Sequence, residues 1–223
     1  MKQASGRFQA FIVHFFISIG LLAPLLAVMC YFWFPGALFK AAGGLQGVKI
    51  LVPVYLVLGP LITFFIFNNA KPRNELLRDV CVVGVLQGVA LIAGMVVIYS
   101  VKPMLVVHVF DTVYVLTRGN LESSGISLDE LDKFSGNYPK FVSVSLSTNP
   151  YDFVLEHTKN MLSGNVPFEY RYDLYENLPR DLSYFTAKLG GDELCLNVDI
   201  ESGYDSGRAC LNIVEKKLTH FER

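Results

Sequence analysis

Charged residues are scarce in this chain of 223 residues, and they are unevenly distributed. Only 17% of the residues are Asp, Glu, Lys or Arg, against about 25% in an ordinary soluble domain, and 52% are hydrophobic. Residues 1–102 contain eight basic and two acidic side chains, a net charge of +6, whereas residues 103–223 carry −7. The hydrophobicity excludes intrinsic disorder. The acidic half would repel phosphates, so we expect no nucleic-acid partner.

Cysteines and catalytic motifs are also few. Four cysteines exclude a disulfide-dense miniprotein, and neither G-x-S-x-G, H-E-x-x-H, a P-loop nor a Rossmann fingerprint occurs. His108 and Asp111 are three residues apart in one expected strand, which places them on opposite faces. We therefore expect no enzymatic activity, no cofactor and no metal site.

Three long uncharged runs match the length of a transmembrane helix. The first lies in residues 8–39, which contain no Asp, Glu, Lys or Arg. At 1.5 Å per residue, a helix of about 20 residues crosses a hydrocarbon layer of about 30 Å. The sequence therefore predicts a membrane domain over residues 1–102, with spans at about 10–34, 50–67 and 80–101.

A cleavable signal peptide is the alternative for the first run, because Lys2 and Arg7 precede it. The run is longer than the apolar core of a signal peptide, and two further runs follow it, so we expect it to be retained as a span. His14 lies about one turn inside this span, where we expect it to anchor the helix at the cytoplasmic interface.

The distribution of basic residues predicts the direction of insertion. With the N-terminus in the cytoplasm, the inner segments contain five basic residues: Lys2, Arg7, Lys71, Arg73 and Arg78. The outer flanks contain three: Lys40, Lys49 and Lys102. We therefore expect a bacterial inner-membrane protein in contact with membrane lipid, with a cytoplasmic N-terminus and a periplasmic C-terminal domain.

Small residues recur at intervals of four in the third run, as Gly84-x-x-x-Gly88 and Ala90-x-x-x-Gly94. Such residues let another helix approach closely, and Gln87 beside them can hydrogen-bond across the contact. Two readings stay open: these glycines pack against the other spans of the chain, or they receive a helix of a partner protein.

Residues 103–223 predict a small periplasmic α+β domain, so the fold class is three transmembrane helices followed by an α+β domain. We expect one long strand over residues 104–117 and another over 141–146, because apolar residues alternate there. Ser127 and Glu130 fit a capping box. Asn149-Pro150 predicts the start of a helix that runs to about Leu162, and we expect another helix at 177–189.

The last two strands are expected at residues 193–200 and 209–214, with a turn at Ser202-Gly203. A hairpin centred there places Cys195 opposite Cys210, and a periplasmic location is oxidising. The sequence therefore predicts a disulfide between these two cysteines.

Four segments resemble the type IV pilin accessory proteins, called TfpX, TfpZ or FimB-like. The matching segments are GRFQAFIVH (6–14), WFPGALF (33–39), VLGPLIT (57–63) with FN (67–68), and VFD (109–111). The motif residues carried by these segments are Arg7, His14, Pro35, Gly36, Gly59, Pro60 and Asp111. The resemblance covers residues 6–115, and one departure is that an acidic residue often found a few positions before V-L-G-P is absent around Tyr55.

The resemblance implies a pilin accessory protein of the fimbrium, an assembly factor or membrane chaperone for type IV pilus biogenesis. Its implied partners are the type IV major pilin and other pilus-assembly proteins, and no active site follows from it. The alternative is a membrane-tethered periplasmic sensor or a subunit of a signalling complex. The expected cytoplasmic parts, residues 1–7 and 68–79, are too small to hold an output domain, so a sensor would need a partner.

Overall fold

The computed structural model describes residues 2–68, 70–144, 150–178 and 195–223. The chain forms two compact units, which are described separately. The first, Met1–Tyr31 with Leu45–Tyr99, is called the helical unit, and the second, Phe32–Gly44 with Ser100–Arg223, is called the sheet unit. The segment 32–44, which joins the first two long helices, therefore belongs by its contacts to the sheet unit.

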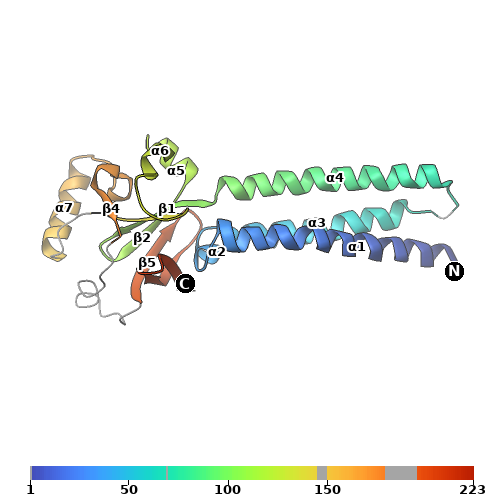
Figure 1. Cartoon of the computed structure of the whole chain (residues 1–223), viewed down its shortest axis with the longest axis horizontal. Helices are drawn as coiled ribbons and strands as arrows, with labels where there is room; N and C mark the ends of the chain where they lie inside the picture. Colours follow the sequence, from blue (N-terminus) through green and yellow to red (C-terminus); the bar gives the residue numbers. More distant parts are fainter. Residues whose placement is uncertain (1, 69, 145–149, 179–194) are drawn as a thin grey trace. The chain divides into compact units, whose positions relative to one another are not determined.

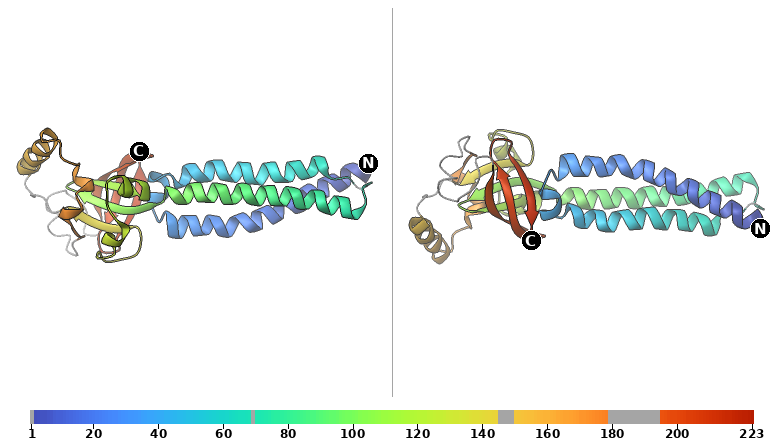
Figure 2. Two further views of the ribbon diagram at one scale, coloured as in Figure 1. Left: turned by 90° about the horizontal axis from the view of Figure 1, so that it is seen from above. Right: turned by 90° about the horizontal axis from the view of Figure 1, so that it is seen from below.

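The helical unit consists of three long helices that run side by side in each view (Figures 1 and 2). They are α1 (Lys2–Val28), continued by the π-helical turn η1 (Met29–Trp33), then α3 (Gly44–Ile66) and α4 (Arg73–Ser100). Over Ser5–Trp33, Gly44–Ile66 and Arg73–Ser100, each is long and apolar enough to cross a membrane.

Each long helix extends beyond the apolar run that predicts it. α3 begins at Gly44 rather than near residue 50, and α4 begins at Arg73 rather than near residue 80. Charged residues do not interrupt a helix. α4 therefore extends back to Arg73, directly after Pro72, and α3 extends back to Gly44, directly after Gly43. Two glycines bring these helices together: a Cβ at Gly94 would lie 2.7 Å from Leu51 Cδ1, and one at Gly47 would lie 2.9 Å from Ile98 Cγ1.

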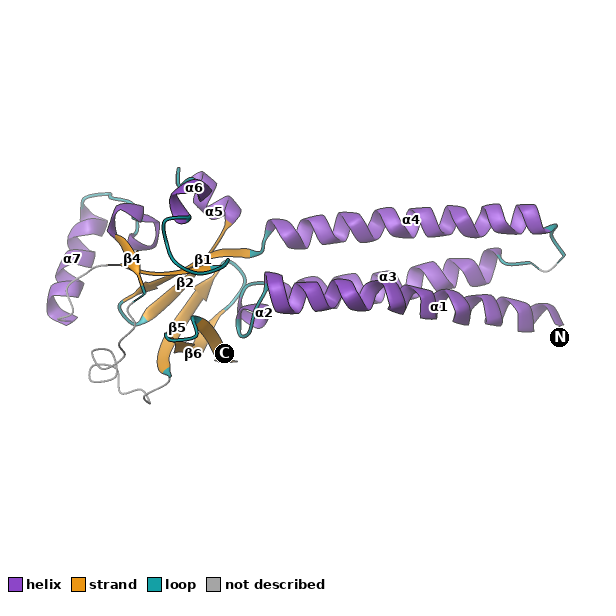
Figure 3. Cartoon of the chain, in the orientation of Figure 1, coloured by secondary structure: helices purple, strands orange, loops and turns teal. Residues whose placement is uncertain are grey.

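The sheet unit contains a mixed sheet of seven strands in the order β4-β3-β1-β2-β5-β6-β7 (Figure 3). Two of its pairs are parallel, β1 with β3 and β2 with β5, and the other four are antiparallel. The strands are β1 (Pro103–Val109), β2 (Thr112–Thr117), β3 (Lys140–Val144), β4 (Tyr175–Asn177), β5 (Leu196–Ser202), β6 (Ser206–Asn212) and β7 (Lys217–Glu222).

Short helices complete this unit. They are α2 (Leu38–Ala41), α5 (Arg118–Ser123), α6 (Leu128–Leu131), α7 (Pro150–Leu162) and the 3-10 turns η2 (Phe168–Tyr170) and η3 (Tyr172–Leu174). A hydrophobic core lies between β1 and α5–α6, where Leu105, Leu121 and Leu131 are fully buried. Burying one such side chain contributes roughly 1.5–3 kcal/mol, so this contact fixes α5 and α6 on the sheet.

Several local predictions are confirmed. Ser127 caps α6 in a capping box with Glu130, and α7 ends at Leu162 before Gly164, whose φ is +65°. A strand covers most of the 141–146 segment, as β3. The capping residue Asn149 lies outside the described residues.

Two local predictions are wrong. The expected single strand at 104–117 is a hairpin, because Phe110 (φ 60°) and Asp111 turn the chain between β1 and β2. His108 and Asp111 therefore do not share a strand. Asn177, the first residue of the helix expected at 177–189, ends strand β4 instead, whereas residues 179–189 lie outside the described residues and the helix there stays a prediction.

Candidate functional site

A cluster of polar side chains joins the three helices of the helical unit. His14 and Ser18 lie four residues apart on α1, and Tyr55, Gly59 and Thr63 follow the same spacing on α3, so each set shares one helix face. The side chains of Ser18 and Thr63 are almost fully buried. Sequence alone offers only a weak signal for this cluster, namely isolated polar residues within apolar runs.

Gln87 of α4 is the centre of the cluster. Its amide nitrogen Nε2 donates to Ser18 Oγ and to the backbone oxygen of Tyr55, both at 3.0 Å. Its amide oxygen lies 2.6 Å from His14 Nε2. One side chain thus bonds to both other helices.

These contacts determine which ring nitrogen of His14 carries the hydrogen. The carbonyl oxygen of Tyr55 can only accept, so the Gln87 amide nitrogen must face it and the amide oxygen must face His14. Nε2 of His14 therefore carries a hydrogen. In the neutral ring, Nδ1 then accepts from the hydroxyl of Thr63 at 2.6 Å. His14 contacts α3 and α4 in this way, and its position at the cytoplasmic interface stays a prediction.

The absence of a side chain at Gly59 leaves room for the amide of Gln87. A Cβ at this position would overlap the Gln87 amide, with Nε2 only 2.6 Å away. Any side chain at residue 59 would therefore displace the amide from its three partners. The glycine of the LGP motif and the glutamine of α4 form one packing unit.

A groove runs beside this cluster between α1 and α4. Its volume is about 330 Å³, and its polar wall is formed by His14, Ser18 and Gln87. Gly84 and Gly88 form part of the α4 wall, and a Cβ built at either residue would have nothing within 4 Å in the described part of the chain. Internal contacts thus account for Gly94, which meets Leu51, whereas Gly84 and Gly88 leave a small-residue surface open.

In the sheet unit, Pro35 and Gly36 begin the segment that packs on strand β7. Gly36 has φ +63°, and a Cβ there would collide with the backbone oxygen of Leu218. The next residue, Ala37, donates its N–H to this same oxygen at 2.7 Å. Further along the segment, the hydroxyl of Ser202 donates to the oxygen of Ala41 at 2.6 Å. Glycine is required at residue 36 both for its backbone angle and for close approach.

The turn residue Asp111 accepts a hydrogen bond from the N–H of Asp199 through its backbone oxygen, at 2.9 Å. Its carboxylate belongs to an acidic neighbourhood with Glu169 and Glu201. Burial and these three carboxylates raise the pKa of Tyr114 to about 12, and burial is also the main cause that raises the pKa of Glu169. Burial lowers the pKa of His108 to about 4, so its ring is uncharged at neutral pH. Within the described residues, no group of three or more His, Cys, Asp or Glu could hold a metal ion.

Comparison with known proteins finds relatives that are all named fimbrial assembly proteins. The chain is 30% identical to the fimbrial assembly protein of serogroups C1 and C2 from Dichelobacter nodosus, over 119 residues that make up 53% of this chain and 87% of the relative. The chain belongs to the fimbrial assembly protein family. The serogroup I and serogroup E1 proteins of the same organism are 30% and 28% identical over 129 residues, 58% of this chain. The match spans about half the length of these two relatives, 48% of each.

No family model matches the chain. No solved structure matches it either.

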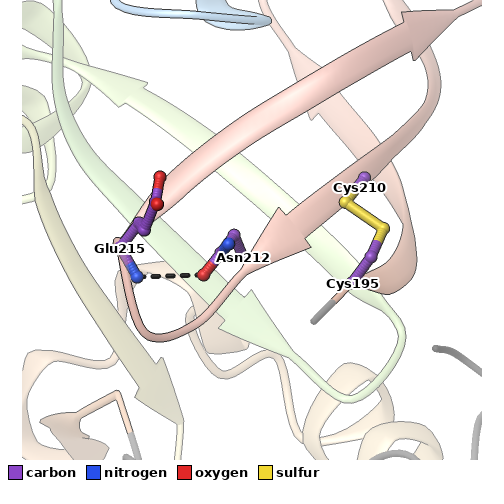
Figure 4. The surroundings of a disulfide bond; sticks show 4 residues. All are labelled: Cys195, Cys210, Asn212 and Glu215. Atoms are coloured by element: carbon purple, nitrogen blue, oxygen red, sulfur yellow. Dashed lines mark hydrogen bonds between the residues drawn. A yellow bond between two sulfur atoms is a disulfide. The ribbon is translucent and has the colours of Figure 1, made fainter. Parts of the chain in front are cut away.

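The disulfide of this family member joins Cys195 to Cys210, with 5.4 Å between their Cα atoms (Figure 4). The register behind the prediction is wrong, because Cys210 pairs with Asn197 across the β5–β6 hairpin rather than with Cys195. The hairpin is centred one residue later than expected, so the two cysteines are diagonal neighbours. Beyond Cys210, Asn212 Oδ1 accepts from the N–H of Glu215 at 2.9 Å and closes the turn towards β7, a strand not expected from the sequence.

Arg7, another of the motif residues, lies near the start of α1 in the helical unit. Its Nε donates to the backbone oxygen of Phe67, one residue beyond α3, at 3.0 Å. A cation at this point interacts favourably with the C-terminal end of the helix. Lys71, in the connector after α3, forms an ion pair at 2.5 Å with Asp79 of α4.

Proposed function

We propose that this protein is an inner-membrane accessory factor of type IV pilus biogenesis that stabilises or assembles one pilin. The observation that carries the proposal is the relationship to the fimbrial assembly protein of serogroups C1 and C2, of which 87% is matched. The three helices long enough to cross a membrane support the location. In this proposal the helices pack against the single apolar helix of the pilin, and the sheet unit lies in the periplasm.

The polar cluster is compatible with a lipid environment. A polar group in hydrocarbon must find its partner within the protein, and Gln87 uses its amide oxygen and nitrogen towards His14, Ser18 and Tyr55. The cluster therefore holds three spans together, because lipid gives no hydrophobic force between helices. This fixed bundle then presents the groove of Gly84 and Gly88 to a further helix.

The groove gives a direct test of pilin recognition. Gly84→Leu and Gly88→Leu should leave the protein abundant, because a Cβ at either position meets open space, and should weaken pilin association about tenfold, equivalent to ~1.4 kcal/mol. The measurement is site-specific cross-linking to full-length pilin in membranes, normalised to the amount of accessory protein, with surface pili counted in parallel.

Gly94→Leu is the matched contrast on the same helix. Its side chain would collide with Leu51, so the expected result is loss of the protein itself. Undiminished pilin cross-linking by abundant Gly84→Leu and Gly88→Leu proteins would exclude the groove as the recognition surface.

The proposed orientation has its own test. A reporter that is active only in the periplasm should be active when fused after Arg223 and silent when fused at Asn74. The reason is the excess of basic residues on the segments proposed to be cytoplasmic. The reverse pattern would overturn the orientation.

A further inference from the structure

Helix α7 presents a row of large apolar side chains to solvent. The row, called the outer face, consists of Tyr151, Val154, Leu155, Met161 and Leu162. These residues follow the helical spacing of three and four, so they lie on one side of α7. Their exposed fractions range from 53% for Leu155 to 86% for Tyr151. The helix lies at the periphery of the sheet unit in each view (Figures 1 and 2).

A different side of α7 contacts the segment that follows the helix. The ring of His157 lies 5.9 Å from that of Phe168, and the buried Asn160 donates its side-chain N–H to the oxygen of Val166 at 3.0 Å. An exposed apolar row on a water-exposed domain can serve as an interaction site.

We propose that the outer face of α7 binds the globular head of the pilin through an apolar groove on that head. This inference rests on the proposed function and adds a second, water-exposed contact to the helix packing in the membrane. The mode is that of an amphipathic helix whose apolar row enters a groove on the partner.

Charge complementarity favours this occupant over a lipid surface. Helices that lie on membranes carry mainly Lys and Arg on their polar side, whereas α7 has Asp152 and Glu156 against Lys159 alone. Residues 103–223 carry a net charge of −7, which anionic lipid would repel. The groove on the pilin head is therefore expected to have a basic rim.

The available area favours a transient client over a second copy of this chain. A helix of 13 residues is about 20 Å long and about 10 Å wide, so its outer face offers only a few hundred Å². A stable interface buries roughly 800 Å² on each partner. Contacts of the smaller size are typical of short-lived complexes, which suits a factor that must release each subunit.

Photo-cross-linking of the full-length protein tests the site. A benzoylphenylalanine placed at Leu155 should cross-link to a purified pilin head that lacks the transmembrane helix, whereas the same probe at Glu156, on the opposite side of α7, should not. Leu155→Ser with Met161→Ser should lower head binding about tenfold, and Lys159→Ser should leave it unchanged. All these positions are exposed, so the fold is retained, as thermal unfolding will check.

The outcomes separate this inference from the proposed function. Cross-linking of residue 155 to a second copy or to lipid, or none to the head while full-length pilin still associates, overturns the α7 site and leaves the function standing. Absence of any association with full-length pilin rejects both.

Discussion

Replacing Gly59 by alanine is expected to destabilise the helical unit by about 2 kcal/mol, although it adds only one methyl group. The new Cβ would occupy the position of the Gln87 amide, which must then leave His14, Ser18 and the Tyr55 oxygen. Hydrogen bonds between membrane helices contribute about 0.6 kcal/mol each on average, so losing three gives this value. Unfolding of the purified protein in detergent, followed by helix content, measures it.

The cause can be isolated by a double-mutant cycle. Gln87→Ala alone should cost a similar amount, but Gly59→Ala added to it should cost almost nothing, because the collision is with the glutamine side chain. Gly84→Ala, which meets open space, is the control and should be neutral. If the costs of Gly59→Ala and Gln87→Ala add in full, the proposed packing unit does not exist.

Removing the disulfide is expected to lower the stability of the sheet unit by about 3 kcal/mol. The bond joins cysteines 15 residues apart, and cross-linking a loop of that size restricts the unfolded chain by this amount in the chain-entropy model. Cys195→Ala and Cys210→Ala, singly and together, should show the same loss in the unfolding of the full-length protein, because either change breaks the same bond.

The free cysteines provide the control for this experiment. Cys81 is exposed and Cys30 is partly buried, and neither forms a disulfide, so Cys81→Ser should leave the stability of the sheet unit unchanged. Addition of reductant to the wild-type protein should reproduce the double alanine variant. Wild-type stability in both alanine variants would show that the bond does not hold the unit together.

Residues 104–117 show what a local hydrophobic pattern cannot distinguish. The segment is rich in valine and alternates only in part, with four consecutive apolar residues at 104–107, yet Phe110 adopts a left-handed backbone angle and the segment becomes β1 and β2. A pattern of period two is the same in one long strand and in two strands joined by a tight turn. The pairing of β1 with both β2 and β3 decides between them.

Sequence alone determined the features that depend on neighbouring residues: the three apolar helices, the Ser127 capping box and the end of α7 before Gly164. It also selected Cys195 and Cys210 as a pair, although through a register one position off.

The tertiary structure decided the contacts that join distant segments, because a sequence pattern shows which face of an element is apolar but not what lies against it. His14 and Gln87 are 73 residues apart, and only the packing of α1, α3 and α4 brings their side chains within 2.6 Å. The space for that contact depends on a third helix, through the missing side chain of Gly59. For the same reason Gly36 acquires its role only when Leu218 of strand β7 lies beside it.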